Sequence, residues 1–124
     1  METILLSVKP EYVERIFVGI KLYEYRKRLP KSDIRKIVVY ATHPIMKVIG
    51  EVEVTKLLLG SPNAIWEQTK ENAGISRAKY REYFKGCRIA YAHQLGQITK
   101  YEIPKSLNDF GVSNPPQSFV YIGE

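Results

Sequence analysis

The densest group of side chains that could do chemistry begins at Gly19. Lys21, Glu24 and Arg26 follow it within seven residues. The lysine and the arginine could together bind an anion, while the glutamate accepts a hydrogen bond from an amino group of a base. Alternatively, a lysine whose pKa is lowered beside a carboxylate can act as a base or a nucleophile. The remaining interpretation is a surface row of ion pairs on a strand, which would contribute little energy.

A second group of candidate ligand-binding residues ends an apolar segment. Tyr40, Thr42 and His43 lie where a strand gives way to a loop, and loops at strand ends often present functional groups. Thr42 and His43 could therefore line the mouth of a pocket beside Lys21. A turn is the favoured interpretation for His43, because the following Pro44 restricts it to extended geometry.

Basic residues are concentrated in one stretch of the chain. The 124 residues include 19 Lys and Arg against 13 Asp and Glu, and seven of the 19 lie between positions 21 and 36. Such a local excess is typical of a protein that binds a phosphate backbone, and a solvated loop is an equally good interpretation. The expected phosphate contacts are Lys27, Arg28, Lys31, Arg35 and Lys36.

Three of the nine tyrosines, Tyr23, Tyr25 and Tyr40, lie in or beside this basic stretch. They could stack on unpaired bases while the lysines follow the phosphates. They could equally fill the edge of a core, because tyrosine joins an apolar ring to a polar tip. Glu71, near the end of a helical segment, could assist an enzyme but is more simply read as a solvated side chain.

The composition argues against several classes of protein. A single cysteine, Cys87, cannot form an internal disulfide and indicates a reducing cytoplasm. Two histidines and one cysteine cannot build a His/Cys zinc site, and we expect neither a metal nor a cofactor. We expect no signal peptide, and no apolar run is long enough to span a membrane. Walker loops, GxGxxG and the nucleophile elbow are absent from the sequence.

The elements that must position these residues alternate between strands and helices. Serine and proline caps predict helices over 10–18, 61–73 and 76–84. Gly50 predicts a bulge or a sharp curl within a strand. The order predicts one α+β domain, residues 1–124, built around a small β-barrel of five or six strands with flanking helices. Apolar and alternating segments predict the strands 4–8, 21–28 (or an extended arm), 37–41, 46–59, 88–95, 98–103 and 118–122.

The motif Gly19-x-Lys21-x-x-Glu24-x-Arg26 resembles the GxKxxExR signature of ASCH domains, members of the PUA-like superfamily. LSVKP before the first helix, YATHP followed by Gly50, and the closing PPQSFVYI are each similar to segments of stand-alone archaeal and bacterial ASCH proteins. The resemblance covers essentially the whole chain. It implies a PUA-like β-barrel of five or six strands with a cleft between the barrel and its flanking helices.

The resemblance also implies binding of RNA or modified nucleobases, with a role in transcriptional regulation in some relatives. Lys21, Glu24 and Arg26 would line the cleft, and Gly19 would permit the turn that exposes them. One ASCH branch deacetylates acetylated cytidine with a lysine, a threonine nucleophile and a glutamate. Lys21 matches that lysine, Glu24 stands where the threonine would be, and Glu71 is a loose match to the glutamate.

Two hypotheses about function remain open from the sequence. The first is a binding module whose motif cleft recognises RNA, single-stranded or structured, or a modified nucleoside. The second is an enzyme, either a nucleoside amidohydrolase or a ribonuclease, that uses Lys21 with Glu24 or Glu71 as an acid–base pair.

Overall fold

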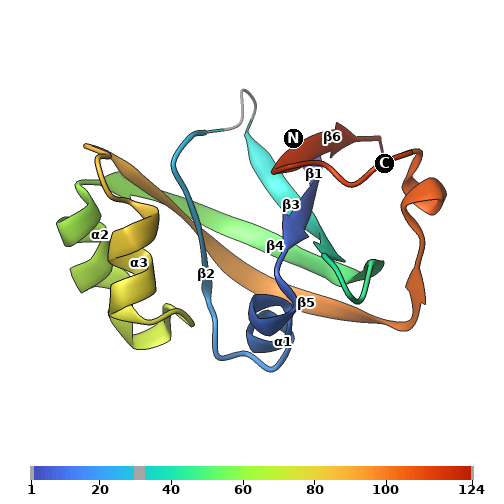
Figure 1. Ribbon diagram of the computed structural model, residues 1–124, viewed down its shortest axis with the longest axis horizontal. Coiled ribbons are helices and arrows are strands. Elements are labelled where there is room, and N and C mark those ends of the chain that lie inside the picture. Colours follow the sequence, from blue (N-terminus) through green and yellow to red (C-terminus); the bar gives the residue numbers. More distant parts are fainter. Residues whose placement is uncertain (1, 30–32, 124) are drawn as a thin grey trace.

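The computed structural model describes residues 2–29 and 33–123 and contains one six-stranded sheet with helices packed against it. The sheet order is β2-β5-β4-β3-β1-β6 (Figure 1). β1 and β3 pair in parallel, and the other neighbouring strands pair antiparallel. The strands are β1 (Glu2–Val8), β2 (Tyr23–Arg26), β3 (Ile34–Ala41), β4 (Lys47–Gly60), β5 (Ala90–Lys105) and β6 (Phe119–Ile122).

The helices begin at the predicted caps. The side chains of Ser61 and Ser76 accept hydrogen bonds from backbone N–H groups three residues further on, and each satisfies one of the unpaired donors of a first helical turn. No helix among the described residues is long and apolar enough to cross a membrane. The helices are α1 (Pro10–Phe17), α2 (Pro62–Thr69) and α3 (Arg77–Tyr83), with 3-10 turns η1 (Lys70–Asn72) and η2 (Leu107–Phe110).

β4 and β5 are long strands that pair with each other along most of their length and bend the sheet. The pairing of β4 with β3 and its pairing with β5 both have a register shift between Val48 and Gly50. The bulge predicted at Gly50 is therefore confirmed. A Cβ at Gly50 would lie 2.8 Å from the Phe17 ring and closer still to the Thr99 carbonyl. The backbone of β4 can therefore approach α1 and β5 this closely only with glycine at position 50.

Two expectations about the sheet need correction. The segments 88–95 and 98–103 are one strand, β5, because register shifts in its ladder with β4 absorb the irregularity around Gly96 without a turn. The sheet is also open, not a closed barrel: β2 and β6 are its two edges. The α+β architecture itself is confirmed.

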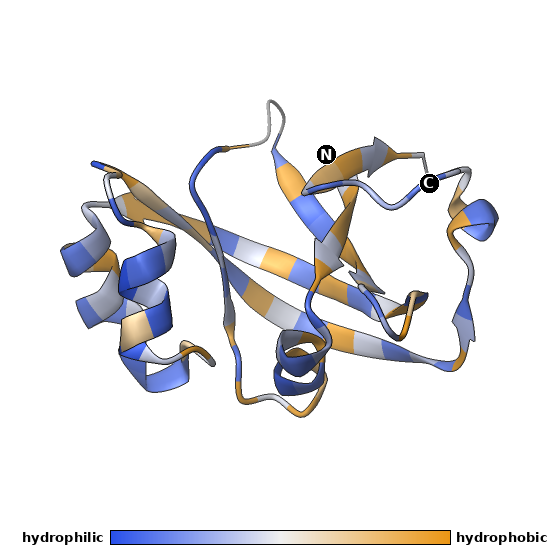
Figure 2. Ribbon diagram, viewed as in Figure 1, coloured by the Kyte–Doolittle hydropathy of each residue, from blue (hydrophilic) through white to orange (hydrophobic). Residues whose placement is uncertain are grey.

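The core is divided among three clusters on the two faces of the sheet. The first packs α1 against β1, β3, β4 and β5, and the second packs α2 and α3 against β2 and β5. The third lies on the opposite face of β1 and β3, where η2 and β6 contribute side chains. Figure 2 shows apolar residues concentrated along the strands, while much of α2 and α3 is hydrophilic. Figure 1 shows α2 and α3 together at one end of the molecule, with η2 and β6 at the other.

Candidate functional site

β2 carries the centre of the motif along one edge of the sheet. It pairs only with β5 within the described part of the chain, and Glu24 lies directly opposite His93 while Arg26 lies opposite Tyr91. Tyr23 and Tyr25 pack toward α2 and α3, as the alternation of side chains along a strand predicted. Glu24 and Arg26 therefore project from the other face, together with His93.

On that face a small pocket lies between the two edges of the sheet. Glu24, Arg26 and Arg28 line it from β2 and the residues after it, and His93 lines it from β5. Its remaining walls are apolar and come from β1, β3 and β6: Ile4, Leu6, Ile37 and Phe119. The pocket thus combines cationic and carboxylate groups with apolar walls, and its cavity of about 10 Å³ has room for about one water molecule.

Arg26 bridges the two sides of this pocket. Its Nη2 donates to Oε2 of Glu24 at 2.8 Å, and its Nη1 donates to Oγ of Ser118 at 3.1 Å. Ser118 directly precedes β6, so one guanidinium joins the two edge strands that backbone hydrogen bonds do not join. The planar fork of arginine suits this double role, because its donors point in fixed directions.

Two buried nitrogen atoms of the pocket residues have no hydrogen-bond partner among the described residues: Nε of Arg26 and Nδ1 of His93. His93 is only 4% exposed. Buried polar groups are nearly always paired, and each exception needs an explanation. Because both atoms belong to residues that line the same pocket, a water molecule or one polar group of a ligand could satisfy them there.

The pKa of His93 is lowered, chiefly because burial disfavours the charged imidazolium. The charge of Glu24 raises the pKa of His93, and so does a hydrogen bond between His93 and the backbone of Glu24. The charge of Arg26 lowers that pKa further. His93 is therefore neutral near pH 7, and a neutral imidazole offers one donor and one acceptor nitrogen.

This shift predicts a stability that depends on pH. Because the pKa of His93 is lower in the folded chain than its ordinary value of 6.5, the unfolded chain binds the extra proton more readily. We expect the free energy of unfolding in urea to fall as the pH is lowered from above 6.5 toward the folded pKa, and this fall to be smaller in His93→Asn. The exposed His43 supplies the matched control variant His43→Asn. Equal profiles for wild type and His93→Asn would contradict the assignment.

Lys21 occupies a different environment from the pocket. Its Nζ donates to the carbonyl of Ala73 at 2.9 Å and lies 4.8 Å from the centre of the Tyr25 ring and 5.5 Å from that of Tyr12. Burial lowers the pKa of Lys21, while the Glu24 charge acts in the opposite direction. Lys21 is 4% exposed, so its amine is an internal cation held by a carbonyl and two aromatic faces.

Gly74 makes this position of Lys21 possible, and the sequence analysis missed it. A Cβ at Gly74 would lie 2.6 Å from Cγ of Lys21 and 2.9 Å from its Cα, and the φ of Gly74 is +66°. The Gly74 carbonyl accepts a hydrogen bond from Arg15 at 3.0 Å, and the Asn72 carbonyl accepts one from the backbone N–H of Leu22 at 2.9 Å. The turn after η1 therefore holds Lys21 and Leu22, at the start of the motif, by hydrogen bonds and close packing. A glycine just beyond a helical segment was the available signal.

Comparison with known proteins identifies the family. Residues 6–101 match the family model described as ASCH domain. The chain belongs to the ASCH domain family. The crystal structure of ASCH from Zymomonas mobilis is 29% identical, with a TM-score of 0.90 over 99% of this chain and 89% of that chain. The α+β fold is thus the PUA-like fold expected from the motif.

Two curated relatives differ in how much of their length the ASCH domain covers. The ASCH domain-containing ribonuclease of Zymomonas mobilis is 34% identical over 125 residues, which are 95% of this chain and 82% of that protein. The ATP synthase subunit alpha of Ureaplasma parvum is 33% identical over 122 residues, which are 98% of this chain. This chain spans only 15% of the length of that second relative.

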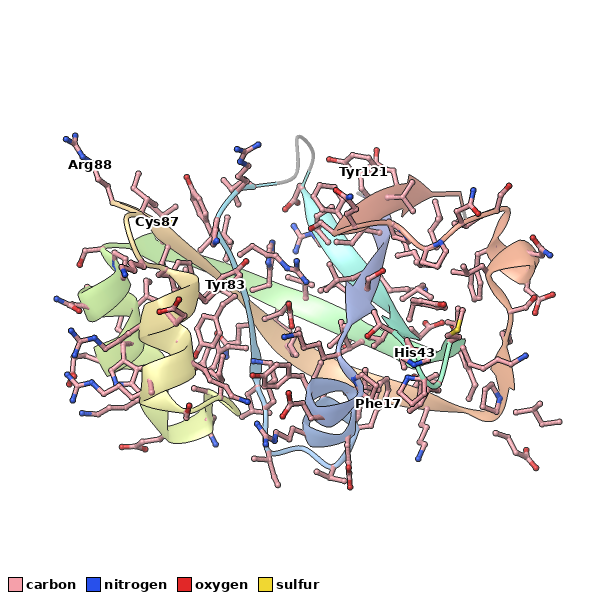
Figure 3. The ribbon with its side chains drawn as sticks, in the orientation of Figure 1. Phe17, His43, Tyr83, Cys87, Arg88 and Tyr121 are labelled. Carbon is pink, nitrogen blue, oxygen red and sulfur yellow. The ribbon has the colours of Figure 1, made fainter. Side chains whose placement is uncertain are left out.

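The structure does not bring all the predicted ligand-binding residues of this ASCH domain together. Tyr40 is 2% exposed in the third core cluster, because the register of β3 turns it to the face opposite the pocket. Thr42 and His43 lie in the turn after β3, as the favoured interpretation of His43 predicted, and neither lines the pocket. Figure 3 places His43 well to one side of Tyr83, which stands beside β2.

Gly19 and Glu71 also lie outside the pocket lining. Gly19 follows α1 with a φ of +84°, so it makes the turn that the motif predicted, although Lys21 beyond it is buried. Glu71 is exposed in η1. The motif of this ASCH domain therefore divides: Glu24 and Arg26 line the pocket, while Lys21 supports the segment that leads into β2.

The five expected phosphate contacts also separate. Arg28 lines the pocket, and the Lys27 amine lies 4.7 Å from the centre of the Tyr83 ring. Arg35 pairs with Asp33 and Lys36 with Glu51, at 3.1 and 3.2 Å. Lys31 lies outside the described residues. Of the four expected contacts that the structure describes, Arg28 thus lines the pocket, Lys27 is its chain neighbour, and Arg35 and Lys36 are held in ion pairs.

Proposed function

We propose that this ASCH domain binds RNA, with the pocket between β2 and β6 as the recognition site. The observation that carries the proposal is the pair of unpartnered buried nitrogens, Nε of Arg26 and Nδ1 of His93, in residues that line one pocket. A ligand with both a hydrogen-bond donor and an acceptor would satisfy them, and nucleotides carry both kinds of group.

The charges around the pocket support a phosphate-bearing ligand. Arg26 and Arg28 both line the pocket. Nη2 of Arg26 donates a hydrogen bond to Glu24, whereas Nε of Arg26 has no partner among the described residues. Arg28 and Lys27 are exposed or partly exposed, so they can contact phosphates outside the pocket. Guanidinium groups bind phosphate oxygens well because they offer several donors in one plane.

RNA cleavage is a second candidate function. It is favoured by the 34% identical relative from Zymomonas mobilis, which is named an ASCH domain-containing ribonuclease and of which this chain covers 82%. In the pocket, a neutral imidazole stands beside a guanidinium, the two kinds of group that could accept a proton and stabilise a developing negative charge. We do not propose the amidohydrolase alternative, because the Lys21 amine is buried and donates to Ala73.

The proposal is tested by titrating a fluorescein-labelled RNA 12-mer of mixed sequence and following its anisotropy. We expect binding whose affinity falls steeply between about 50 mM and about 200 mM salt, because each phosphate contact releases counterions. Lys27→Ala/Arg28→Ala should weaken binding and reduce the slope of log K against log salt by roughly 0.7 for each phosphate that the variant no longer neutralises. The control is Lys100→Ala, since Lys100 is exposed on β5 and lies seven residues beyond His93.

Each outcome of this titration has a meaning. Binding that is absent at low salt, or identical in the double variant and wild type, would contradict the proposal. The same mixtures run on a denaturing gel test the second candidate. Cleavage by wild type that His93→Asn abolishes, with both proteins purified in parallel, would support a ribonuclease and exclude a contaminating nuclease.

A further inference from the structure

The face of the sheet that carries the pocket continues beyond it across three strands. The pairing of β2 with β5 and of β5 with β4 defines two rows of directly opposite residues. The first row is Glu24, His93 and Leu57, of which Glu24 and His93 line the pocket. The second row, beside it, is Arg26, Tyr91 and Leu59. Directly opposite residues of antiparallel strands project from the same face, with Cβ atoms about 5 Å apart.

Both rows end on β4 in a leucine side chain that reaches solvent. Leu59 is 61% exposed and Leu57 is 37% exposed, while Tyr91 is half-buried. We call Tyr91, Leu57 and Leu59 the Tyr91 stripe. No residue of the stripe belongs to a core cluster of the described chain, whereas Leu58 and Ala92, on the same two strands, pack under α2 and α3. The stripe is therefore not needed to fill the interior.

Charged side chains lie on β2, the strand that pairs with β5 beside Tyr91. Glu24, Arg26 and Arg28 alternate along β2 and its extension, and all three line the pocket. At the far end of the stripe, Arg88 is exposed near the start of β5, and Figure 3 shows it at the tip of the molecule. Arg26 and Arg28 thus place two cations beside the stripe, and proteins that bind single-stranded nucleic acid combine cations that follow the phosphates with aromatic side chains on which the bases stack.

We propose that the Tyr91 stripe stacks the bases of single-stranded RNA whose phosphates contact Arg26 and Arg28. This inference rests on the proposed function and adds to it the form of the RNA. A duplex keeps its bases stacked on one another and offers this face only its sugar–phosphate backbone. Continuity with the pocket favours RNA as the occupant over a protein, because Arg26 lines the pocket and also lies directly opposite Tyr91 of the stripe.

The test compares a fluorescein-labelled 12-mer of RNA alone and annealed to its complement. We expect wild type to bind the single strand more tightly than the duplex. Tyr91→Ala should weaken binding of the single strand roughly tenfold, because stacking on one aromatic ring contributes about 1–3 kcal/mol per base. Tyr91→Phe keeps the ring and should bind like wild type. Ile103→Ala is the control, since Ile103 is 77% exposed further along β5.

The salt dependence separates stacking from a general loss of structure or charge. Tyr91→Ala should lower affinity at every salt concentration without changing the slope, whereas Lys27→Ala/Arg28→Ala should change the slope. If Tyr91→Ala does not fold, Leu59→Ser takes its place, because the exposed Leu59 contributes little to the interior. It should also weaken binding of the single strand.

Four results would overturn the inference, and they are distinguishable. Salt-sensitive RNA binding that neither Tyr91→Ala nor Leu59→Ser weakens would reject the stripe and leave the proposed function standing. Equal affinity for single strand and duplex would reject the preference for single-stranded RNA. A wild-type dimer in gel filtration that Leu59→Ser dissociates would assign the stripe to a second copy of the chain. Absence of RNA binding by wild type would reject the proposed function as well.

Discussion

Gly74→Ala is expected to lower the free energy of unfolding by about 3 kcal/mol, because a new Cβ meets Lys21 and the backbone keeps a positive φ. The φ of Gly74 is +66°, and its Cβ would lie within 3 Å of the Lys21 backbone, which cannot rotate away as a side-chain tip can. Urea denaturation followed by circular dichroism measures the change.

Two matched glycines isolate the contribution of the contact with Lys21. Gly19 and Gly86 have φ values of +84° and +81°, and a Cβ on either would meet no atom of the described residues within 4 Å. Gly19→Ala and Gly86→Ala should therefore cost only the backbone strain, about 1 kcal/mol each. If Gly74→Ala costs no more than these two variants, the close packing of the turn on Lys21 does not stabilise the fold.

Arg26→Ala is expected to destabilise the chain by about 3 kcal/mol, because it leaves the buried Glu24 carboxylate without its partner. The Arg26–Glu24 pair is 2.8 Å long, with side chains 19% and 10% exposed. The variant also removes the hydrogen bond to Ser118 that joins β2 to the segment before β6. Thermal and urea unfolding both report this loss.

Comparison with an exposed pair makes the second prediction specific. Arg35 and Asp33 pair at 3.1 Å with side chains 53% and 70% exposed, so Arg35→Ala should change the free energy of unfolding by at most about 0.5 kcal/mol. Adding Glu24→Gln to Arg26→Ala should restore part of the stability, because the double variant buries no unpaired charge. A double variant less stable than Arg26→Ala alone would show that the charge of Glu24 is not the source of the loss.

These variants bear on why the motif is divided between two environments. Glu24 and Arg26 line the pocket. Their strand, β2, begins two residues after Lys21, whose side chain contacts Ala73, Tyr12 and Tyr25. Lys21 can thus influence the pocket by holding the start of β2, without touching a ligand there. A buried cation in this position is a supporting group, not one of the pocket side chains.

The features that the sequence determined by itself are local. The alternation around Tyr23 and Tyr25 predicted which side chains of β2 share a face, and the structure confirms that separation. Ser61 and Ser76 predicted two helix starts, because a capping hydroxyl needs only the next three residues. Gly50 predicted a bulge for the same kind of reason. The GxKxxExR motif identified the family.

The composition of the pocket depends on residues that are far apart in the chain. His93 and Ser118 meet Glu24 and Arg26 because β5 and β6 are brought beside the β2 edge, and no local pattern encodes that approach. Tyr40 was expected near a ligand and is in the core, since a strand's register decides which face each residue takes and a shift of one residue reverses it. Lys21 and Gly74 likewise depend on one close contact across 53 positions. Local propensity sets the elements, but long-range packing decides which side chains share a pocket.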